Sequence, residues 1–186
     1  MEPDGRVSDG QVALRPMRAD DWEAIHSFAG LQEVYRYQAW EANTAEQTRE
    51  YVADAAAAFE DPAQTRFYLS AVHPREHIVG LAQVTIHSAE WRCAEIGYTV
   101  HPDHWGRGFG TMIAHLVVDY AFRELGMHRV QATCDPRNVA SAGILRKVGM
   151  THEGTLRHTM RLRDGWRDSH MFSLLEDEWR RRGDDR

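Results

Sequence analysis

The stretch Glu95-Ile-Gly-Tyr-Thr-Val-His-Pro-Asp-His-Trp-Gly-Arg-Gly-Phe-Gly110 decides the fold of this chain. It overlaps a strand pattern at residues 93–100, and it opens a helix whose apolar residues recur at spacings of three and four over residues 109–121. The first amides of such a helix have no partner inside the helix and carry the positive end of its dipole. A strand, a glycine-rich turn and a helix N-terminus in this order therefore predict an anion-binding site.

Three glycines in this turn, Gly106, Gly108 and Gly110, let a phosphate approach the backbone without meeting a Cβ atom. Arg107 can add a charge-assisted hydrogen bond to a phosphate oxygen. The pattern is not a dinucleotide fingerprint, because Thr111 stands where the third glycine belongs, and it is not a P-loop, because no lysine is near. A glycine cluster alone would equally suit a tight strand-to-helix turn.

The segments on both sides of this turn predict a mixed α/β sheet with helices between its strands. Capping-box patterns at Asp20 with Glu23 and at Thr44 with Gln47 predict the start of two helices, which end near residues 28 and 59. Two more helices are expected from residue 109 to Gly126 and over residues 139–148. The expected strands are residues 12–17, 67–72, 78–87, 93–100, 130–134, 155–162 and 167–175.

The length of 186 residues predicts one domain with short appendages, since domains average about 150 residues. Residues 1–10 are polar and are expected to form a disordered leader, and the charge run at residues 180–186 a solvated tail. The domain is therefore expected to span residues 11–179.

Charge and composition exclude several classes of partner. The net charge of −6 disfavours nucleic acid, whose binding depends on neutralised phosphates, and leaves room for an amine-bearing partner. No apolar run approaches the roughly 18–20 residues of a membrane span, and the acidic N-terminus is not a signal peptide. Cys93 and Cys134 are expected to stay unpaired, which suits a cytoplasmic protein. A homodimer is compatible with the sequence, which does not decide the oligomeric state.

The eleven histidines do not form a metal-binding pattern. His101 and His104 are three residues apart but lie on either side of Pro102, with no cysteine at zinc spacing. Neither an H-E-x-x-H stretch nor a G-x-S-x-G stretch occurs, so we expect no metal and no serine-hydrolase chemistry.

Three motifs resemble the GNAT superfamily of acyl-CoA-dependent N-acetyltransferases. Trp105-x-x-Gly108-x-Gly110 is similar to its pyrophosphate loop, Q/R-x-x-G-x-G/A, with tryptophan at the Gln/Arg position. Residues 138–141 (NVAS) and 145–150 (LRKVGM) resemble the N-x-x-S and L-x-K-x-G-F signature of the RimJ/RimL-type branch, which acetylates ribosomal-protein N-termini. Residues 164–169 and 174–179 resemble the end of the same branch. The resemblance extends from about residue 12 to residue 179.

The resemblance implies the GNAT fold, a mostly antiparallel sheet in which two parallel strands, here residues 93–100 and 130–134, splay apart. It implies acetyl-CoA as co-substrate and direct transfer of the acetyl group to an amine bound at the same time. Backbone groups at Thr99 and Val100 would pair with the pantetheine arm. The implied cofactor-binding residues are Tyr98, Thr99, Val100, Trp105, Gly106, Arg107, Gly108, Phe109, Gly110, Thr111, Asn138 and Ser141.

The resemblance also suggests catalytic roles. The backbone N–H of Val100 would polarise the thioester carbonyl. Because an α-amino group has a pKa of about 7.7–8, a carboxylate acting through water suffices as the base, and Glu95 is the first candidate. Glu95 is equally well explained as a salt-bridged surface acid. Ser141 would protonate the departing thiolate, and Asn138 would bond the pantetheine. For both residues the alternative is a purely structural role at the start of a helix.

The acceptor is not identified by any motif. Tyr35, Tyr37 and Trp40 lie between the first two expected helices, a segment that lines the acceptor site in the family, and they are candidates for contact with an amine-bearing peptide or small molecule, including an antibiotic. Two alternatives stay open. The chain could bind acyl-CoA without turnover as a sensor or scaffold, or it could transfer another acyl group such as succinyl.

Overall fold

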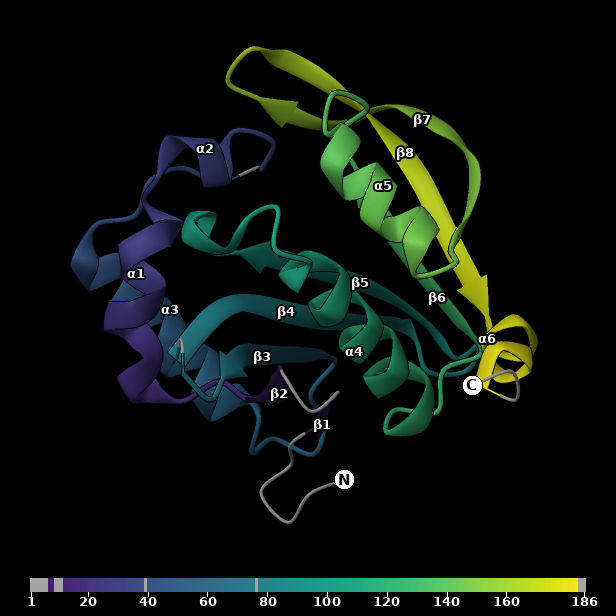
Figure 1. Ribbon diagram of the computed structural model, residues 1–186, viewed down its shortest axis with the longest axis horizontal. Helices are drawn as coiled ribbons and strands as arrows, with labels where there is room; N and C mark the ends of the chain where they lie inside the picture. The colour runs from purple at the N-terminus through teal and green to yellow at the C-terminus, as the bar shows by residue number, and fades with distance from the viewer. Residues whose placement is uncertain (1–6, 9–11, 39, 76, 184–186) are drawn as a thin grey trace.

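The computed structural model describes residues 7–8, 12–38, 40–75 and 77–183. Within them, eight strands form one sheet in the order β1-β2-β3-β4-β5-β6-β8-β7 (Figure 1). The parallel neighbours are β5 and β6, and the other adjacent pairs are antiparallel. The expected mixed α/β sheet is thus confirmed. The strands are β1 (Val7–Ser8), β2 (Ala13–Pro16), β3 (Arg66–His73), β4 (His77–Ser88), β5 (Cys93–Val100), β6 (Arg129–Cys134), β7 (Thr151–Leu162) and β8 (Gly165–Leu175).

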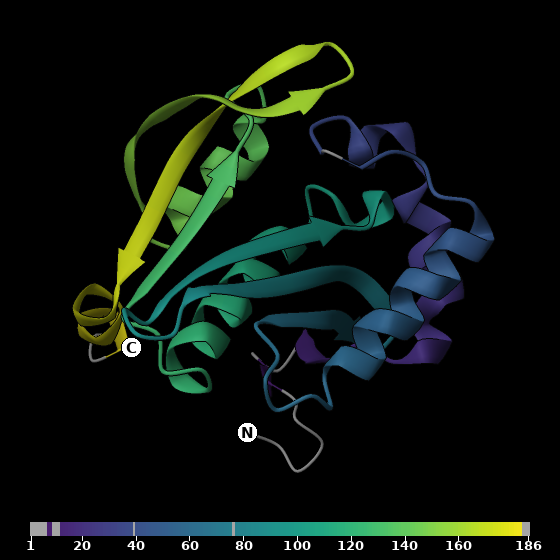
Figure 2. The same ribbon diagram turned by 180° about the vertical axis from the view of Figure 1, so that it is seen from behind.

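Helices cover both faces of this sheet. The helix α4, which follows the glycine-rich turn, and α5 lie on one face (Figure 1), whereas α3 crosses the other face (Figure 2) and packs against α1. The α-helices are α1 (Trp22–Ala29), α2 (Gln32–Tyr35), α3 (Ala45–Ala58), α4 (Phe109–Arg123), α5 (Val139–Lys147) and α6 (Glu176–Gly183), and 3-10 turns occupy η1 (Ala19–Asp21) and η2 (Pro102–His104).

The apolar stripe of α4 forms the centre of the main core. Ile113, Val117 and Ala121 are completely buried, at the expected spacing of four residues, and they pack on alternate residues of β3, β4 and β5. A smaller cluster that includes Ile25 and Val52 joins α1 and α3 on the other face. The sheet is therefore held between two helical layers and is fixed in position.

The two parallel strands separate after only three paired positions. The register joins Cys93 to Arg129, Ala94 to Val130 and Glu95 to Gln131, and no pair follows. From this point β5 continues beside β4, and β6 continues beside β8 (Figures 1 and 2). The result is a V-shaped gap in the middle of the sheet with Glu95 at its vertex, as expected for the two strands.

The two expected capping boxes have different outcomes. At α3, Thr44 accepts from the N–H of Gln47, and the side chain of Gln47 accepts from the N–H of Thr44, so this box is confirmed. The expectation for Asp20 is wrong, because the chain there forms the turn η1 and α1 begins only at Trp22, without a side-chain cap.

The reason for this difference is a buried cluster around Asp21. Its carboxylate accepts both a bidentate pair of bonds from Arg15 on β2, at 2.6 and 2.7 Å, and a bond from Ser70 on β3, at 2.7 Å. Together with a local bond from the N–H of Arg18 at 2.9 Å, these three bonds fix the chain in the turn η1 before the helix begins.

The described residues at both ends of the chain contact the domain. Of the expected leader, residues 7–8 form β1, which pairs with β2, and residues 1–6 and 9–10 lie outside the described residues. At the other end, the charge run is helical as far as Gly183. Trp179 donates to Asp119 at 2.6 Å, and Arg182 donates to the carbonyl of Val148 at 3.1 Å, so α6 is tied to the domain.

Candidate active site

The edge of β5 presents free backbone groups to the gap. The N–H of His101 donates to the carbonyl of Val79 on β4 at 2.9 Å. Because consecutive residues of a strand point their backbone groups to opposite sides, the N–H and the carbonyl of Val100 face away from β4 and into the gap. The same alternation turns the backbone of Thr99 toward Leu81 of β4. The groups of Tyr98 and Val100, rather than those of Thr99, therefore line the open edge.

Trp105 fixes the start of the glycine-rich turn to this edge. Its indole N–H donates to the carbonyl of Val100 at 2.9 Å, although the side chain is half exposed. Because this bond occupies the carbonyl of Val100, the N–H is the backbone group of Val100 that a ligand can reach. Trp105 at the Gln/Arg position thus has a structural role that the sequence did not indicate.

The turn itself has the geometry of an anion site. Gly106 and Gly108 have φ angles of +72° and +87°, a left-handed conformation that favours glycine. The N–H groups of Thr111 and Met112 both donate to the carbonyl of Gly108. Within the described part of the chain, the N–H groups of Gly108, Phe109 and Gly110 have no hydrogen-bond partner, as expected for the first turn of a helix.

These glycines open onto a long groove of about 1010 Å³. It is bounded by the edge of β5, the glycine-rich turn, the first half of α5 and the segment around α2. Among the expected cofactor residues, Tyr98, Thr99, Val100, Trp105, Gly106, Gly108, Gly110, Thr111, Asn138 and Ser141 line this groove.

Arg107 and Phe109 are placed elsewhere. The ring of Phe109 is buried in the core, and the guanidinium of Arg107 lies over it at 5.1 Å and meets Nδ1 of His104 at 3.0 Å. Neither residue lines the groove. The side chain of Arg107 therefore does not reach the turn's anion site in this conformation.

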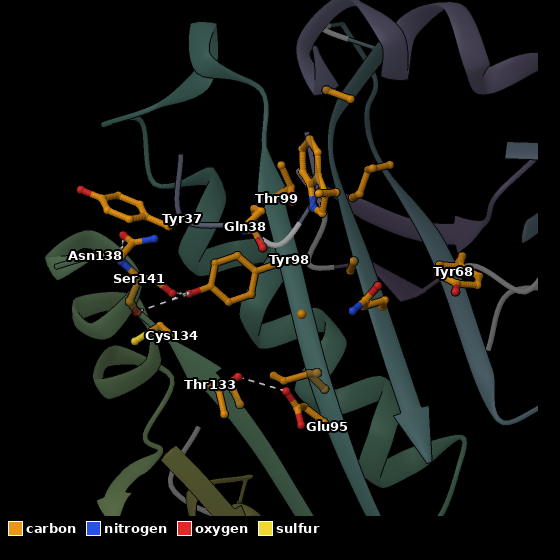
Figure 3. Close-up of a pocket in the computed structure, with 18 of the residues that line it drawn as sticks. Tyr37, Gln38, Tyr68, Glu95, Tyr98, Thr99, Thr133, Cys134, Asn138 and Ser141 are labelled. Carbon is orange, nitrogen blue, oxygen red and sulfur yellow. Dashed lines mark hydrogen bonds between the residues drawn. The ribbon is translucent and has the colours of Figure 1, made fainter. Parts of the chain in front are cut away.

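A second cavity of about 480 Å³ meets the groove at the gap. Its walls include Glu95 and Thr133 near the vertex and aromatic side chains from β3, α3 and the segment after α2. The residues that line both spaces are Tyr37, Gln38, Tyr98, Thr99, Asn138 and Ser141 (Figure 3). Two ligands can therefore approach each other at Tyr98 and Ser141, one from each space.

Tyr98 and Ser141 point toward one another across this junction (Figure 3). The phenol oxygen of Tyr98 lies 3.2 Å from Oγ of Ser141, and it donates to the carbonyl of Ser141 at 3.4 Å. Burial raises the pKa of Tyr98 to about 12, so the phenol stays neutral and keeps its proton. Asn138 accepts from the N–H of Ser141 at 3.1 Å and caps α5. The contact between Tyr98 and Ser141 was not expected from the sequence.

Glu95 lies at the vertex and lines the second cavity. Thr133 donates to one carboxylate oxygen at 3.1 Å, as Figure 3 shows, and Nε2 of His87 lies 3.1 Å from the other. Both interpretations of Glu95 therefore have a basis in the structure: the carboxylate is paired with a histidine, and it is also part of the cavity wall.

The three acceptor candidates are not equivalent. Tyr37 and Trp40 line the second cavity, whereas Tyr35 lines neither space. The ring of Tyr35 lies 6.1 Å from that of Trp40 and under the guanidinium of Arg163 at 4.7 Å. Tyr35 thus packs against Trp40 without lining the cavity itself.

Two charged residues of the cavity wall were missed by the sequence reasoning, Asp135 and Arg167. Burial raises the pKa of Asp135, but three hydrogen bonds from the side chain of Arg137 outweigh this, and the pKa is lowered overall. Asp135 directly follows a predicted strand, which was the available signal for it. No sequence pattern pointed to Arg167.

In the described ranges, no three His, Cys, Asp or Glu side chains gather closely enough to hold a metal ion. None of the helices described is long and apolar enough to cross a membrane. Cys93 and Cys134 are both free thiols.

Comparison with known proteins identifies the family. Residues 11–151 match the profile of the acetyltransferase (GNAT) domain. The chain is 30% identical to YoaA of Bacillus subtilis, an uncharacterized N-acetyltransferase, over 89% of this chain and 94% of that protein. It is 25% identical to the spermidine N(1)-acetyltransferase of Escherichia coli over 90% and 88% of the two chains.

Solved structures agree on the fold. A GNAT acetyltransferase from Bacillus anthracis superposes with a TM-score of 0.80 at 26% identity, over 93% of this chain and 99% of that one. A ribosomal-protein-S5-alanine acetyltransferase from Vibrio fischeri superposes with a TM-score of 0.79 at 20% identity, over 94% and 98%.

The chain therefore belongs to the GNAT acetyltransferase family. It is an N-acetyltransferase, and acetyl-CoA is its acyl donor. The fold and the family expected from the sequence are confirmed. The comparisons do not single out the RimJ/RimL-type branch, because the relatives include both ribosomal-protein and spermidine enzymes.

Proposed function

We propose that this protein acetylates a primary amine, on a protein N-terminus or a small molecule, by direct attack on acetyl-CoA with both substrates bound. The observation that carries the proposal is the junction of two ligand-sized spaces at Tyr98 and Ser141, inside the gap between β5 and β6. Direct transfer needs both substrates to meet in one place, and the junction supplies it. An amine acceptor is also supported by relatives that are named for acetylating spermidine and a ribosomal-protein alanine.

The groove suits the CoA part of the donor. The free N–H groups of Gly108, Phe109 and Gly110, at the positive end of the α4 dipole, would bind the diphosphate. The open edge of β5 at Tyr98 and Val100 would pair with the pantetheine amides as a neighbouring strand would. The remaining groove residues, Thr99, Trp105, Gly106, Thr111 and Asn138, would form its walls. This arrangement depends mostly on backbone groups.

The chemistry would take place at the junction. The N–H of Val100 would bind the thioester oxygen and stabilise the negative charge that develops on it. A C–N bond forms and the C–S bond breaks. Glu95 would accept the proton of the attacking amine through water, and the hydroxyl of Ser141, hydrogen-bonded to Tyr98, would protonate the thiolate. Ser141 would regain its proton from water, to which Glu95 releases the proton of the amine.

The test measures free thiol and product mass after incubation with acetyl-CoA and a panel of amines, peptides and aminoglycosides. Ser141→Ala is expected to lower kcat about 10²- to 10⁴-fold, the range for loss of a general acid, with little effect on CoA binding. Ser27→Ala, which removes an exposed hydroxyl on α1, is the matched control. Full turnover by Ser141→Ala would refute the role of Ser141.

The same experiment, repeated with succinyl-CoA, separates the other functions. CoA binding with no thiol release for any amine would indicate a sensor or scaffold, and release only from succinyl-CoA would indicate another acyl group. A cytoplasmic location is part of the proposal and is supported by the two free thiols. The homodimer stays a prediction.

A further inference from the structure

Arg167 is a buried cation in the wall of the second cavity. It lies on β8, its side chain is only 8% exposed, and it belongs to the residues that line the space next to the junction. Its Nη1 donates to the carbonyl of Tyr37 at 3.0 Å, and its Nη2 donates to Oγ of Ser169 at 2.7 Å. The Nε atom is buried and has no hydrogen-bond partner.

The hydrogen bonds of this guanidinium are incomplete. A guanidinium carries five N–H donors, and partners among the described residues account for two of them. Buried donors without a partner are rare in folded proteins, and a charged one is especially unfavourable. An acceptor atom that arrives with a ligand would remove this cost. Arg167 is thus prepared for a group that the protein itself does not provide.

The cavity also carries opposite charges at its two ends. Glu95 lies at the vertex, beside Gln131. Arg167 lies at the other end of the cavity. It precedes His170, the residue of β8 that pairs with the last residue of β6, Cys134, and it contacts Tyr37. The carboxylate of Asp135 near this end is already occupied by Arg137. The amine of an acceptor is therefore favoured on the side of Arg167 that faces the junction and Glu95, and a second positive charge is disfavoured near Arg167.

We propose that Arg167 binds a carbonyl or carboxylate oxygen carried on the carbon next to the acceptor amine. The acceptor is then an amino acid, an amino-acid amide or a peptide N-terminus, and not a polyamine. This inference rests on the proposed acetyl transfer and adds the class of acceptor. The oxygen is held beside Tyr37, and the amine points toward Tyr98 and Ser141.

The test uses three amines with one carbon skeleton: L-phenylalaninamide, L-phenylalanine and phenethylamine, which lacks the carbonyl group. Spermidine is the fourth. Wild type is expected to acetylate at least one of the two carbonyl-bearing amines in preference to phenethylamine and spermidine. A preference for the amide indicates a peptide-like acceptor, and a preference for the acid indicates a free amino acid.

Arg167→Lys keeps one positive donor for the carbonyl of Tyr37 but loses the planar fork. It is expected to lower kcat/KM for the preferred carbonyl-bearing amine about 10- to 100-fold, the range for hydrogen bonds to a charged group. For phenethylamine, kcat/KM should change by less than about threefold, since that amine has no oxygen for Arg167 to bind. Comparison of each amine between the two enzymes removes the effect of the amines' different pKa values.

Arg163→Lys is the matched control. Arg163 holds the same segment by donating to the carbonyl of Trp40 at 2.7 Å, but it does not line the cavity. Arg163→Lys should leave the ratio of the amide to phenethylamine within about twofold, because it removes no contact to the acceptor. An equal loss for all amines in Arg167→Lys would show that Arg167 only holds the segment, and would overturn the inference. Preference of wild type for spermidine would overturn it as well.

Failure of the proposed function is recognised separately. If wild type binds acetyl-CoA but releases thiol with none of the amines, the transfer reaction is refuted. Calorimetric titration of L-phenylalaninamide and phenethylamine into the CoA-bound protein then still decides the role of Arg167. Equal affinity for the two amines would overturn that role, and tighter binding of the amide that is lost in Arg167→Lys would support it.

Discussion

At Gly110 the start of the helix α4 packs closely against Ile144 of α5, and Gly110→Ala tests this packing. A Cβ atom at this position would lie 2.8 Å from Cδ1 of Ile144 and 3.4 Å from Cγ2 of Val100, whereas ordinary contacts begin at 3.4 Å. Such overpacking costs about 1–3 kcal/mol. Replacing glycine inside a helix returns up to about 1 kcal/mol, so the net loss of stability is expected to be about 0–3 kcal/mol.

Because these two effects partly cancel, a double-mutant cycle is the sharper measurement. Ile144→Val removes the atom that the new Cβ meets, and alone it should cost about 0.5–1.5 kcal/mol. In the double variant the two changes fit each other, and the combined loss should be smaller than the sum of the single losses by at least about 1 kcal/mol. For a chain of this length, 1 kcal/mol corresponds to about 2–4 °C in Tm.

The assay is thermal and urea unfolding of the four proteins, with Gly143→Ala as the control. Gly143 is also a helical glycine, but a Cβ atom there meets nothing within 4 Å, so this variant should gain up to about 1 kcal/mol. Additive losses in the cycle, within about 0.3 kcal/mol, would refute the close approach of the two helices. The same would follow if Gly110→Ala were stabilised as much as Gly143→Ala.

Two further predictions concern single hydrogen bonds. Tyr98→Phe removes the hydroxyl beside Ser141, so kcat should fall about 2- to 12-fold, the range for a neutral hydrogen bond. The dissociation constant of CoA should stay unchanged. A change in that constant with no change in kcat would contradict the role of Tyr98 beside Ser141. Hydrogen bonds from Arg129 and Ser173 lower the pKa of Glu153 from 4.5 to about 2, so the stability they add is present above pH 4.5 and is lost as the pH falls toward 2. Glu153→Gln should reduce stability at pH 7 by less than about 1 kcal/mol, because the pair is partly exposed, and urea midpoints of the two proteins should converge by pH 2.

The strand, turn and helix that border the groove could be predicted from the sequence because they are specified locally. The strand β5, the glycine-rich turn and α4 are consecutive in the chain, and each is specified by residues within a few positions of one another. The box of Thr44 and Gln47 was predictable for the same reason. Asp20 was assigned wrongly because the bonds of Asp21 to Arg15 on β2 and Ser70 on β3 fix the chain there, and the pattern of Asp20 with Glu23 contains neither partner.

The acceptor half could not be predicted because its contacts join distant segments. Arg167 and Tyr37 are 130 positions apart, and Arg163 and Trp40 are 123 positions apart, yet each arginine holds a carbonyl of the segment after α2. These bonds form only when the hairpin of β7 and β8 folds over that segment. The aromatic residues there were visible in the sequence, but the cations that organise them were not.

The two halves of the site also use different groups for recognition, and this affects how much a relative can show. In the proposed function the groove binds CoA mostly through backbone groups of the turn and of β5, which depend little on the side chains. Trp105 at the Gln/Arg position is compatible with this proposal, and its indole donates to the carbonyl of Val100. The second cavity depends on side chains such as Arg167 and Glu95, each of which a single substitution changes. The acyl donor of this chain can therefore be inferred from relatives at 25–30% identity, whereas its acceptor has to be inferred from its own side chains.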